Sequence, residues 1–95
     1  MGVRENKVEK RISNGVKKLG GFTKKWGQQS NPDMVIFCQG VVDFIEVKTV
    51  DGPRAKQQER RVIEMCDQGA SAFFIEGHKE ADEYLVKLEK RINKC

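Results

Sequence analysis

Three charged residues interrupt two apolar segments in the middle of this 95-residue chain. Asp33 precedes the segment Met34–Phe37, Glu46 lies inside the segment Val41–Val47, and Lys48 follows it directly. A buried charge without a partner is costly, and a chain of this length forms one modest core. These charges therefore need a chemical explanation.

The Gln39-Gly40 pair between the two segments predicts a tight turn, so we expect them to pair as antiparallel strands. Asp33 and Glu46 lie at equal sequence separation from the centre of that turn, which brings their carboxylates together. Two converging carboxylates repel each other unless a cation neutralises them. Carboxylates, a strand carbonyl and water molecules suit Mg²⁺ or Mn²⁺.

Lys48 shares a strand face with Glu46, because side chains alternate between faces. Beside a metal site it would orient or activate a water molecule, or stabilise charge on a phosphate. A divalent ion that polarises a phosphate and activates water is a common route to phosphodiester hydrolysis. The alternative is a surface salt bridge, since Glu-x-Lys alone is common and Glu5-Asn6-Lys7 matches it too. Pro-Asp, the hairpin-length gap and the apolar surroundings favour the metal site.

An expected N-terminal helix offers a third acid. Glu5 falls inside its apolar stripe and Glu9 falls on the edge, so Glu5 is the candidate. The alternative for Glu5 is an exposed first-turn carboxylate that favours the helix dipole. The stripe consists of apolar residues at helical spacing, namely Val8, Ile12, Val16 and Leu19.

Gln58 lies in register with the apolar residues Val62 and Met65 of a second expected helix, so its amide should point toward the sheet. Near a helix N-terminus such an amide can hold a phosphate or the attacking water. A boundary glutamine that is bonded to the backbone is the alternative.

Apolar periodicity and turn residues predict the elements that must position these groups. They are a helix over 4–19, strands over 22–26, 34–38 and 41–49, a helix from 51–53 to about 68, a strand over 70–75 and a helix from about 80 to 93. The crossover into the last strand should be right-handed and parallel. The order α-β-β-β-α-β-α predicts an α/β protein, with a mixed sheet flanked by helices.

With 38% hydrophobic and 34% charged residues, the composition fits a single globular domain spanning residues 1–95, with a charged and hydrated surface. The net charge of +4 mildly favours polyanionic partners such as nucleic acids. Widely spaced Cys38, Cys66 and Cys95 suggest reduced thiols, and His78 is expected in a solvent-facing turn. No apolar run matches a signal peptide or a membrane span, so we expect an intracellular, cytoplasmic protein.

Taken together, the motifs resemble the virus-type replication-repair nuclease (VRR-NUC) family of the PD-(D/E)xK nuclease superfamily. The resemblance covers nearly the whole chain and implies a restriction-endonuclease-like fold without added domains. The matching residues are Glu5, Gly20-Gly21 with Lys25, Pro32-Asp33, Glu46-Val47-Lys48 and Gln58.

The resemblance implies that Asp33, Glu46 and the Val47 carbonyl bind Mg²⁺, for which Mn²⁺ could substitute. Glu5 would complete the acidic set, in its own subunit or across a dimer. Lys48 would serve the nucleophilic water, and Gln58 would support the site. The positive charge concentrates in two clusters, over residues 7–25 and 54–61, and within them the candidate DNA contacts are Lys24, Lys25, Arg54 and Lys56.

The expected activity is a Mg²⁺-dependent, structure-selective DNA endonuclease acting in DNA repair on branched DNA, such as four-way junctions. Small stand-alone relatives look like homodimers similar to phage-encoded proteins, and a two-fold axis suits paired cuts. The alternatives are cleavage of flap, single-stranded or duplex DNA, or a non-catalytic DNA-binding domain. Intact Asp33, Glu46 and Lys48 argue against the non-catalytic alternative.

Overall fold

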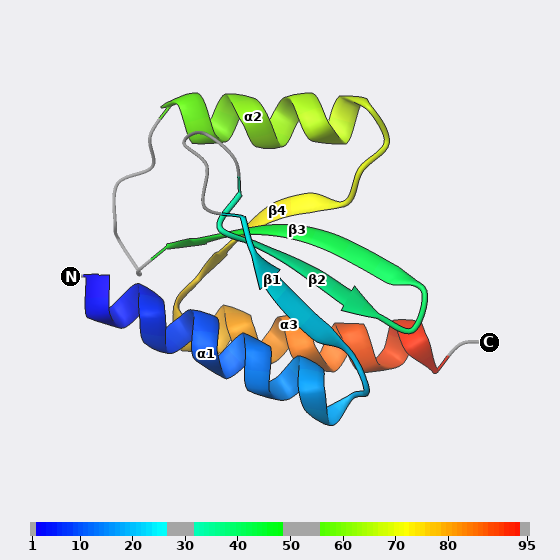
Figure 1. Cartoon of the computed structure of the whole chain (residues 1–95). Helices are drawn as coiled ribbons and strands as arrows, with labels where there is room; N and C mark the ends of the chain where they lie inside the picture. Colours follow the sequence, from blue (N-terminus) through cyan, green and yellow to red (C-terminus); the bar gives the residue numbers. More distant parts are fainter. Residues whose placement is uncertain (1, 27–31, 49–55, 94–95) are drawn as a thin grey trace.

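The computed structural model describes residues 2–26, 32–48 and 56–93, except for the side chains of residues 2–6. Its elements follow the expected order, so the predicted α/β fold is confirmed (Figure 1). They are α1 (Gly2–Lys18), β1 (Phe22–Lys25), β2 (Met34–Cys38), β3 (Val41–Lys48), α2 (Lys56–Asp67), β4 (Ala72–Glu76) and α3 (Gly77–Ile92).

The four strands form one mixed sheet in the order β1-β2-β3-β4. β1, β2 and β3 pair antiparallel, and β4 lies parallel to β3 after the α2 crossover. Gln39 and Gly40 join β2 to β3 with φ angles of 46° and 90°. Two consecutive positive φ values suit the twist of a tight hairpin, which explains the turn that the sequence predicts.

The helices cover the two faces of the sheet unequally. α1 and α3 lie together under one face, and α2 lies alone over the other (Figure 1). The core forms between the sheet and the α1–α3 layer, where Val8, Ile12 and Val16 of the apolar stripe are buried and Leu19 packs against them partly buried. Its fully buried aliphatic side chains include Ile12, Val16, Ile36, Ile45, Val47, Ile75 and Leu88. None of the helices within the described ranges is long and apolar enough to cross a membrane.

The pair Gly20 and Gly21 lets the chain turn from α1 directly into β1. Gly20 has a φ of 88°, which suits a helix C-terminus. A Cβ atom on Gly21 would lie 2.3 Å from the Phe37 carbonyl oxygen, so only glycine allows β1 to approach β2 here.

A buried charge that the sequence analysis did not single out lies on the α3 side of β3. Asp43 is 0% exposed and accepts a hydrogen bond from the Tyr84 hydroxyl at 2.6 Å. Arg91 donates to it from Nη1 at 2.8 Å and from Nη2 at 3.2 Å. Burial and the bond to Asp43 raise the pKa of Tyr84 above its usual range. The network fastens the C-terminal half of α3 to the sheet.

The last helix begins earlier than the sequence suggests. Gly77 has a φ of 77°, so β4 passes into α3 without a loop, and the Glu80 carboxylate accepts a hydrogen bond from the Glu76 N–H at 2.8 Å. His78 therefore lies exposed in the first turn of α3 rather than in a separate turn. The expected start of the second helix, at 51–53, lies outside the described residues, as does Thr49.

Replacing Arg91 by methionine should lower the free energy of unfolding by about 2 kcal/mol, because the Asp43 carboxylate would stay buried without its cation. The matched control is Arg11→Met, which breaks an exposed 2.9 Å pair with Asp82. That change should cost less than about 0.5 kcal/mol. Urea denaturation measures both, and equal losses would contradict a structural role for the buried pair.

Candidate active site

The hairpin brings Asp33 and Glu46 together at its open end. Met34 pairs with Ile45, and one further step of this register places Asp33 opposite Glu46. The Val47 N–H donates to Asp33 Oδ2 at 2.8 Å, and the Trp26 N–H donates to the Asp33 carbonyl at 2.9 Å. Asp33 is therefore fixed from both neighbouring strands.

Glu46 carries a buried carboxylate beside a second carboxylate and an ammonium group. Its side chain is 1% exposed, and neither carboxylate oxygen has a hydrogen-bond partner within the described part of the chain. Lys48 Nζ lies 3.4 Å from Oε2, an ion-pair distance without hydrogen-bond geometry. Burial, followed by the negative charge of Asp33, raises the pKa of Glu46 to about 7, while the Lys48 ammonium opposes this shift.

These donors fit a hard divalent cation. Buried carboxylate oxygens without partners are rare in proteins, and a cation would satisfy those of Glu46 while removing its repulsion from Asp33. The N–H and C=O of one residue point to the same side of a strand, so the Val47 carbonyl faces the Asp33 side together with its N–H. Two carboxylates, one carbonyl and water molecules suit the preference of Mg²⁺ for oxygen ligands.

The third acid is not supplied by any side chain that the structure describes. Across those side chains, no group of three or more histidine, cysteine, aspartate or glutamate residues is placed to hold a metal ion. The backbone of Glu5 lies in α1, but its side chain falls outside the description. The prediction that Glu5 joins Asp33 and Glu46 stays a prediction.

Gln58 lies in the first turn of α2, on the helix that covers the Glu46 face of the sheet (Figure 1). Its Oε1 atom is buried and has no hydrogen-bond partner among the described residues. Within the described residues, Gln58 is therefore a second side chain, after Glu46, with a buried oxygen that lacks a hydrogen-bond partner, and its helix covers the Glu46 face of the sheet. The alternative of a backbone-bonded amide oxygen receives no support from these residues.

The predicted DNA-contacting lysines divide between the two faces of the sheet. Lys25 lies on the α1 side, where its ammonium contacts Glu9 Oε1 at 3.0 Å, and this bond raises the pKa of Lys25. Lys24 alternates to the Glu46 face and is exposed, as is Lys56 at the start of α2. Arg54 lies outside the described residues.

The pair of Glu9 and Lys25 was not predicted, although two patterns could have found it. Glu9 falls at the edge of the apolar stripe of α1, and strand alternation turns Lys25 toward that helix. The pair gives Glu9 a structural partner.

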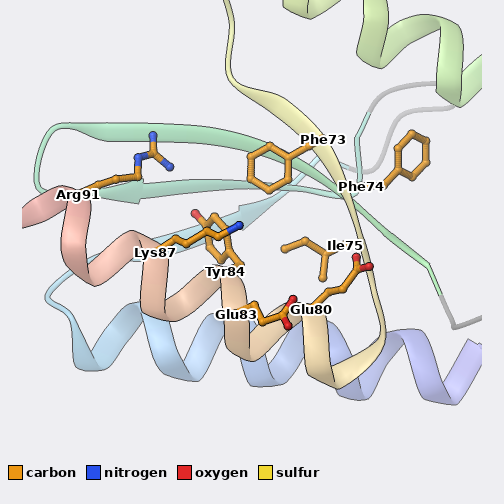
Figure 2. A pocket seen from close by; sticks show the side chains of 8 residues that line it. All are labelled: Phe73, Phe74, Ile75, Glu80, Glu83, Tyr84, Lys87 and Arg91. Atoms are coloured by element: carbon orange, nitrogen blue, oxygen red, sulfur yellow. The ribbon is translucent and has the colours of Figure 1, made fainter.

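A separate pocket of about 470 Å³ lies between β4 and α3 (Figure 2). Phe73, Tyr84 and Ile75 form its apolar part, and charged side chains of α3 surround it. Phe74 points away from these residues, toward the opposite face of the sheet (Figure 2). The pocket contains none of the three residues Asp33, Glu46 and Lys48, so it is distinct from the candidate active site.

A mixed sheet whose central hairpin carries Asp33 and Glu46-x-Lys48 has the architecture of the nuclease-fold domains. No sequence-family model and no curated protein matches this chain. A solved VRR_NUC domain matches with a TM-score of 0.79 and 27% identity, covering 88% of this chain and 95% of that one. This match confirms the resemblance to the VRR-NUC family.

A second solved structure shares the fold at greater distance. It is Hjc of Archaeoglobus fulgidus, a Holliday junction resolvase, with a TM-score of 0.57 and 18% identity. The match covers 76% of this chain and 62% of that one. Both comparisons support the assignment of the α-β-β-β-α-β-α order to a nuclease fold.

The raised pKa of Glu46 predicts how the stability of the metal-free protein depends on pH. The folded state binds the Glu46 proton more tightly than the unfolded state does, which adds to the free energy of unfolding. This contribution is complete below pH 4.5 and is lost as the pH rises through about 7. The loss should be about 3 kcal/mol, and Glu46→Gln should remove it. Urea denaturation in EDTA at pH 5 and pH 8 measures the difference.

Glu89→Gln is the matched control, since Glu89 is exposed on α3. It should retain the wild-type dependence on pH. If Glu46→Gln also follows the wild-type curve, Glu46 does not titrate as its burial requires.

Proposed function

We propose that this protein is a Mg²⁺-dependent, structure-selective DNA endonuclease that hydrolyses phosphodiester bonds in branched DNA. The observation that carries the proposal is the buried carboxylate of Glu46, which lies beside Asp33 with no hydrogen-bond partner among the described residues. The similarity to a VRR_NUC domain supports a nuclease. The resolvase named in the second comparison makes a four-way junction the first substrate to test.

In this proposal Asp33, Glu46 and the Val47 carbonyl hold the Mg²⁺ ion, and Mn²⁺ can replace it. When bound, the ion would polarise a phosphate oxygen and lower the pKa of a water molecule. Asp33 is kept in place by the Val47 N–H, so the two carboxylates hold a fixed separation on the rigid hairpin. A rigid support matters because catalysis depends on groups placed before the reaction begins.

Lys48 is the residue that would act on the substrate. Its ammonium lies 3.4 Å from Glu46 and its side chain is 13% exposed, so it would meet a phosphate or a water molecule bound beside the carboxylates. There it would orient the attacking water or stabilise charge on the phosphate. The Gln58 amide oxygen would accept a hydrogen bond from that water. Glu5 would complete the acidic set, from its own subunit or from a second one.

The substrate would approach over the face that carries Glu46. Lys24 and Lys56 are exposed there and would contact phosphates, with Arg54 as a further candidate. Lys25 would contribute from the sheet edge while it is paired with Glu9. A homodimer with a two-fold axis would present two such sites, which suits paired cuts in a junction. Such an enzyme would act in DNA repair within a phage-infected or bacterial cytoplasm.

Cleavage of labelled substrates tests the proposal. Four-way junction, flap, single-stranded and plain duplex DNA are each incubated with Mg²⁺, Mn²⁺ or EDTA. We expect either metal to support cleavage of the branched substrates and EDTA to abolish it. If the protein cleaves flap, single-stranded or duplex DNA faster than the four-way junction, that DNA is its substrate instead of the junction. Binding without cleavage of any of these DNAs would indicate a non-catalytic DNA-binding domain.

Glu46→Gln and Lys48→Met should each lower the cleavage rate by about 100-fold or more, because each removes a group that acts on the reacting phosphate or its water. Glu89→Gln and Lys90→Met are matched controls on the exposed side of α3 and should retain the wild-type rate. Fluorescence anisotropy with labelled junction DNA in EDTA separates lost catalysis from lost binding. Unchanged cleavage in both active-site variants would rule out these assignments.

A further inference from the structure

The sheet face that carries Glu46 also carries a row of aromatic side chains. The rings of Trp26 and Phe44 have centroids 5.6 Å apart, and Phe44 precedes Glu46 by two residues on the same face of β3. The rings of Phe22 and Phe37 stack across β1 and β2 at 5.1 Å.

We call this row the aromatic strip. Its rings are those of Phe22, Trp26, Phe37 and Phe44, and we include Lys24 and Val42, which lie among these rings on the Glu46 face by strand alternation.

The outer end of the aromatic strip is exposed. Phe22 is 51% exposed and Val42 is 44% exposed, although both are large apolar residues. Of the described elements, α2 packs mainly against β4, at the opposite edge of the sheet from β1 (Figure 1). The strip therefore begins beside the candidate active site and ends on an apolar surface.

The spacing of the aromatic strip suits a strand of nucleotides. Side chains on one face of a strand repeat about every 6.7 Å, so the row of Phe22, Phe37 and Val42 lies about 13 Å from the carboxylates of the hairpin. Aromatic rings bind unpaired bases by stacking, and a cation within such a surface binds the phosphates between them. Lys24 is exposed between Phe22 and Trp26, and no carboxylate of the described residues pairs with it.

We propose that the aromatic strip binds unpaired nucleotides of a DNA strand whose phosphate lies at Asp33 and Glu46. This rests on the proposed nuclease function and deepens it: among branched substrates it favours those with unpaired nucleotides beside the cleavage point, such as a flap or a four-way junction whose base pairs open at the crossover. A fully paired duplex would present its bases stacked inside the helix, where Phe22 and Trp26 could not reach their faces.

A second copy of the chain is the other occupant that an exposed apolar surface suggests. A stable dimer buries about 800 Å² on each partner, which is more than the outer strip alone offers. An interface of that size would extend over the neighbouring carboxylates and would bury the charge of Lys24. Because DNA must lie on this face for Asp33 and Glu46 to act, nucleotides fit the strip better.

Intrinsic fluorescence tests this inference directly, because Trp26 is the one tryptophan of the chain. The full-length protein is titrated in EDTA with a short oligothymidine strand and, separately, with a blunt duplex of the same length. We expect the single strand to quench Trp26 fluorescence saturably and the duplex to quench it little. Quenching by neither DNA, or by both equally, would overturn the inference.

Phe22→Leu keeps an apolar side chain but removes the stacking ring, so it should weaken single-strand binding on the order of tenfold. The matched control is Val86→Ala, which shortens an exposed apolar side chain on α3 and should leave the affinity unchanged. Circular dichroism establishes that both variants are folded. Unchanged affinity in folded Phe22→Leu would contradict the stacking role.

Lys24→Ala provides a second, independent measurement on an exposed position. It should reduce the slope of log affinity against log salt concentration by about 0.7, as expected for one lost contact to a single-strand phosphate. An unchanged slope would show that Lys24 makes no contact with a phosphate of the bound strand. Sedimentation of wild type and Phe22→Leu tests the second-copy alternative, since a mass that halves in the variant would overturn the nucleotide assignment.

These outcomes can be told apart from failure of the proposed function. The binding measurements are made in EDTA and do not depend on cleavage. A protein that cuts branched DNA with Mg²⁺ but shows no quenching of Trp26 would keep the nuclease proposal and lose the aromatic strip. A protein that shows the quenching but cuts no DNA would keep the strip as a nucleotide-binding surface.

Discussion

The repulsion between two carboxylates at the open end of one hairpin is the constraint on which the candidate site depends. Asp33 is fixed by the Val47 N–H at 2.8 Å, and Glu46 is buried by its position in the third strand of the sheet. The hairpin register holds the backbones of the two residues opposite each other. Burial, followed by the negative charge of Asp33, raises the pKa of Glu46 to about 7, so a neighbouring positive charge would favour the ionised carboxylate.

The rest of the molecule makes that hairpin rigid. α1 and α3 bury the apolar face beneath it, and Gly21 allows the first strand to pack closely against the second. Asp43 lies on the same strand as Glu46, with its side chain on the opposite face, where Tyr84 and Arg91 satisfy it fully. One strand therefore carries two buried carboxylates, and within the described residues only Asp43 has hydrogen-bond partners.

Much of this arrangement could be predicted from sequence because it depends on local rules. Turn residues, strand alternation and helical periodicity predicted the element order and the meeting of Asp33 with Glu46. The network around Asp43 could not be predicted, because it joins residues up to 48 positions apart through side-chain packing. The start of the last helix was missed because Gly77 adopts a positive φ and removes the expected loop. The aromatic strip could not be predicted without the strand register, because the register is what pairs Phe22 with Phe37.

Titration calorimetry of Mn²⁺ binding is the most direct test of a metal site at Asp33 and Glu46. Wild-type protein near pH 7 should bind Mn²⁺ and release a fraction of a proton, because Glu46 must ionise to become a ligand. Measuring the heat in two buffers of different ionisation enthalpy gives the proton count, and Glu46→Gln should lose both the binding and the proton release. Binding of equal strength in Glu46→Gln, or no binding by the wild type, would contradict the account.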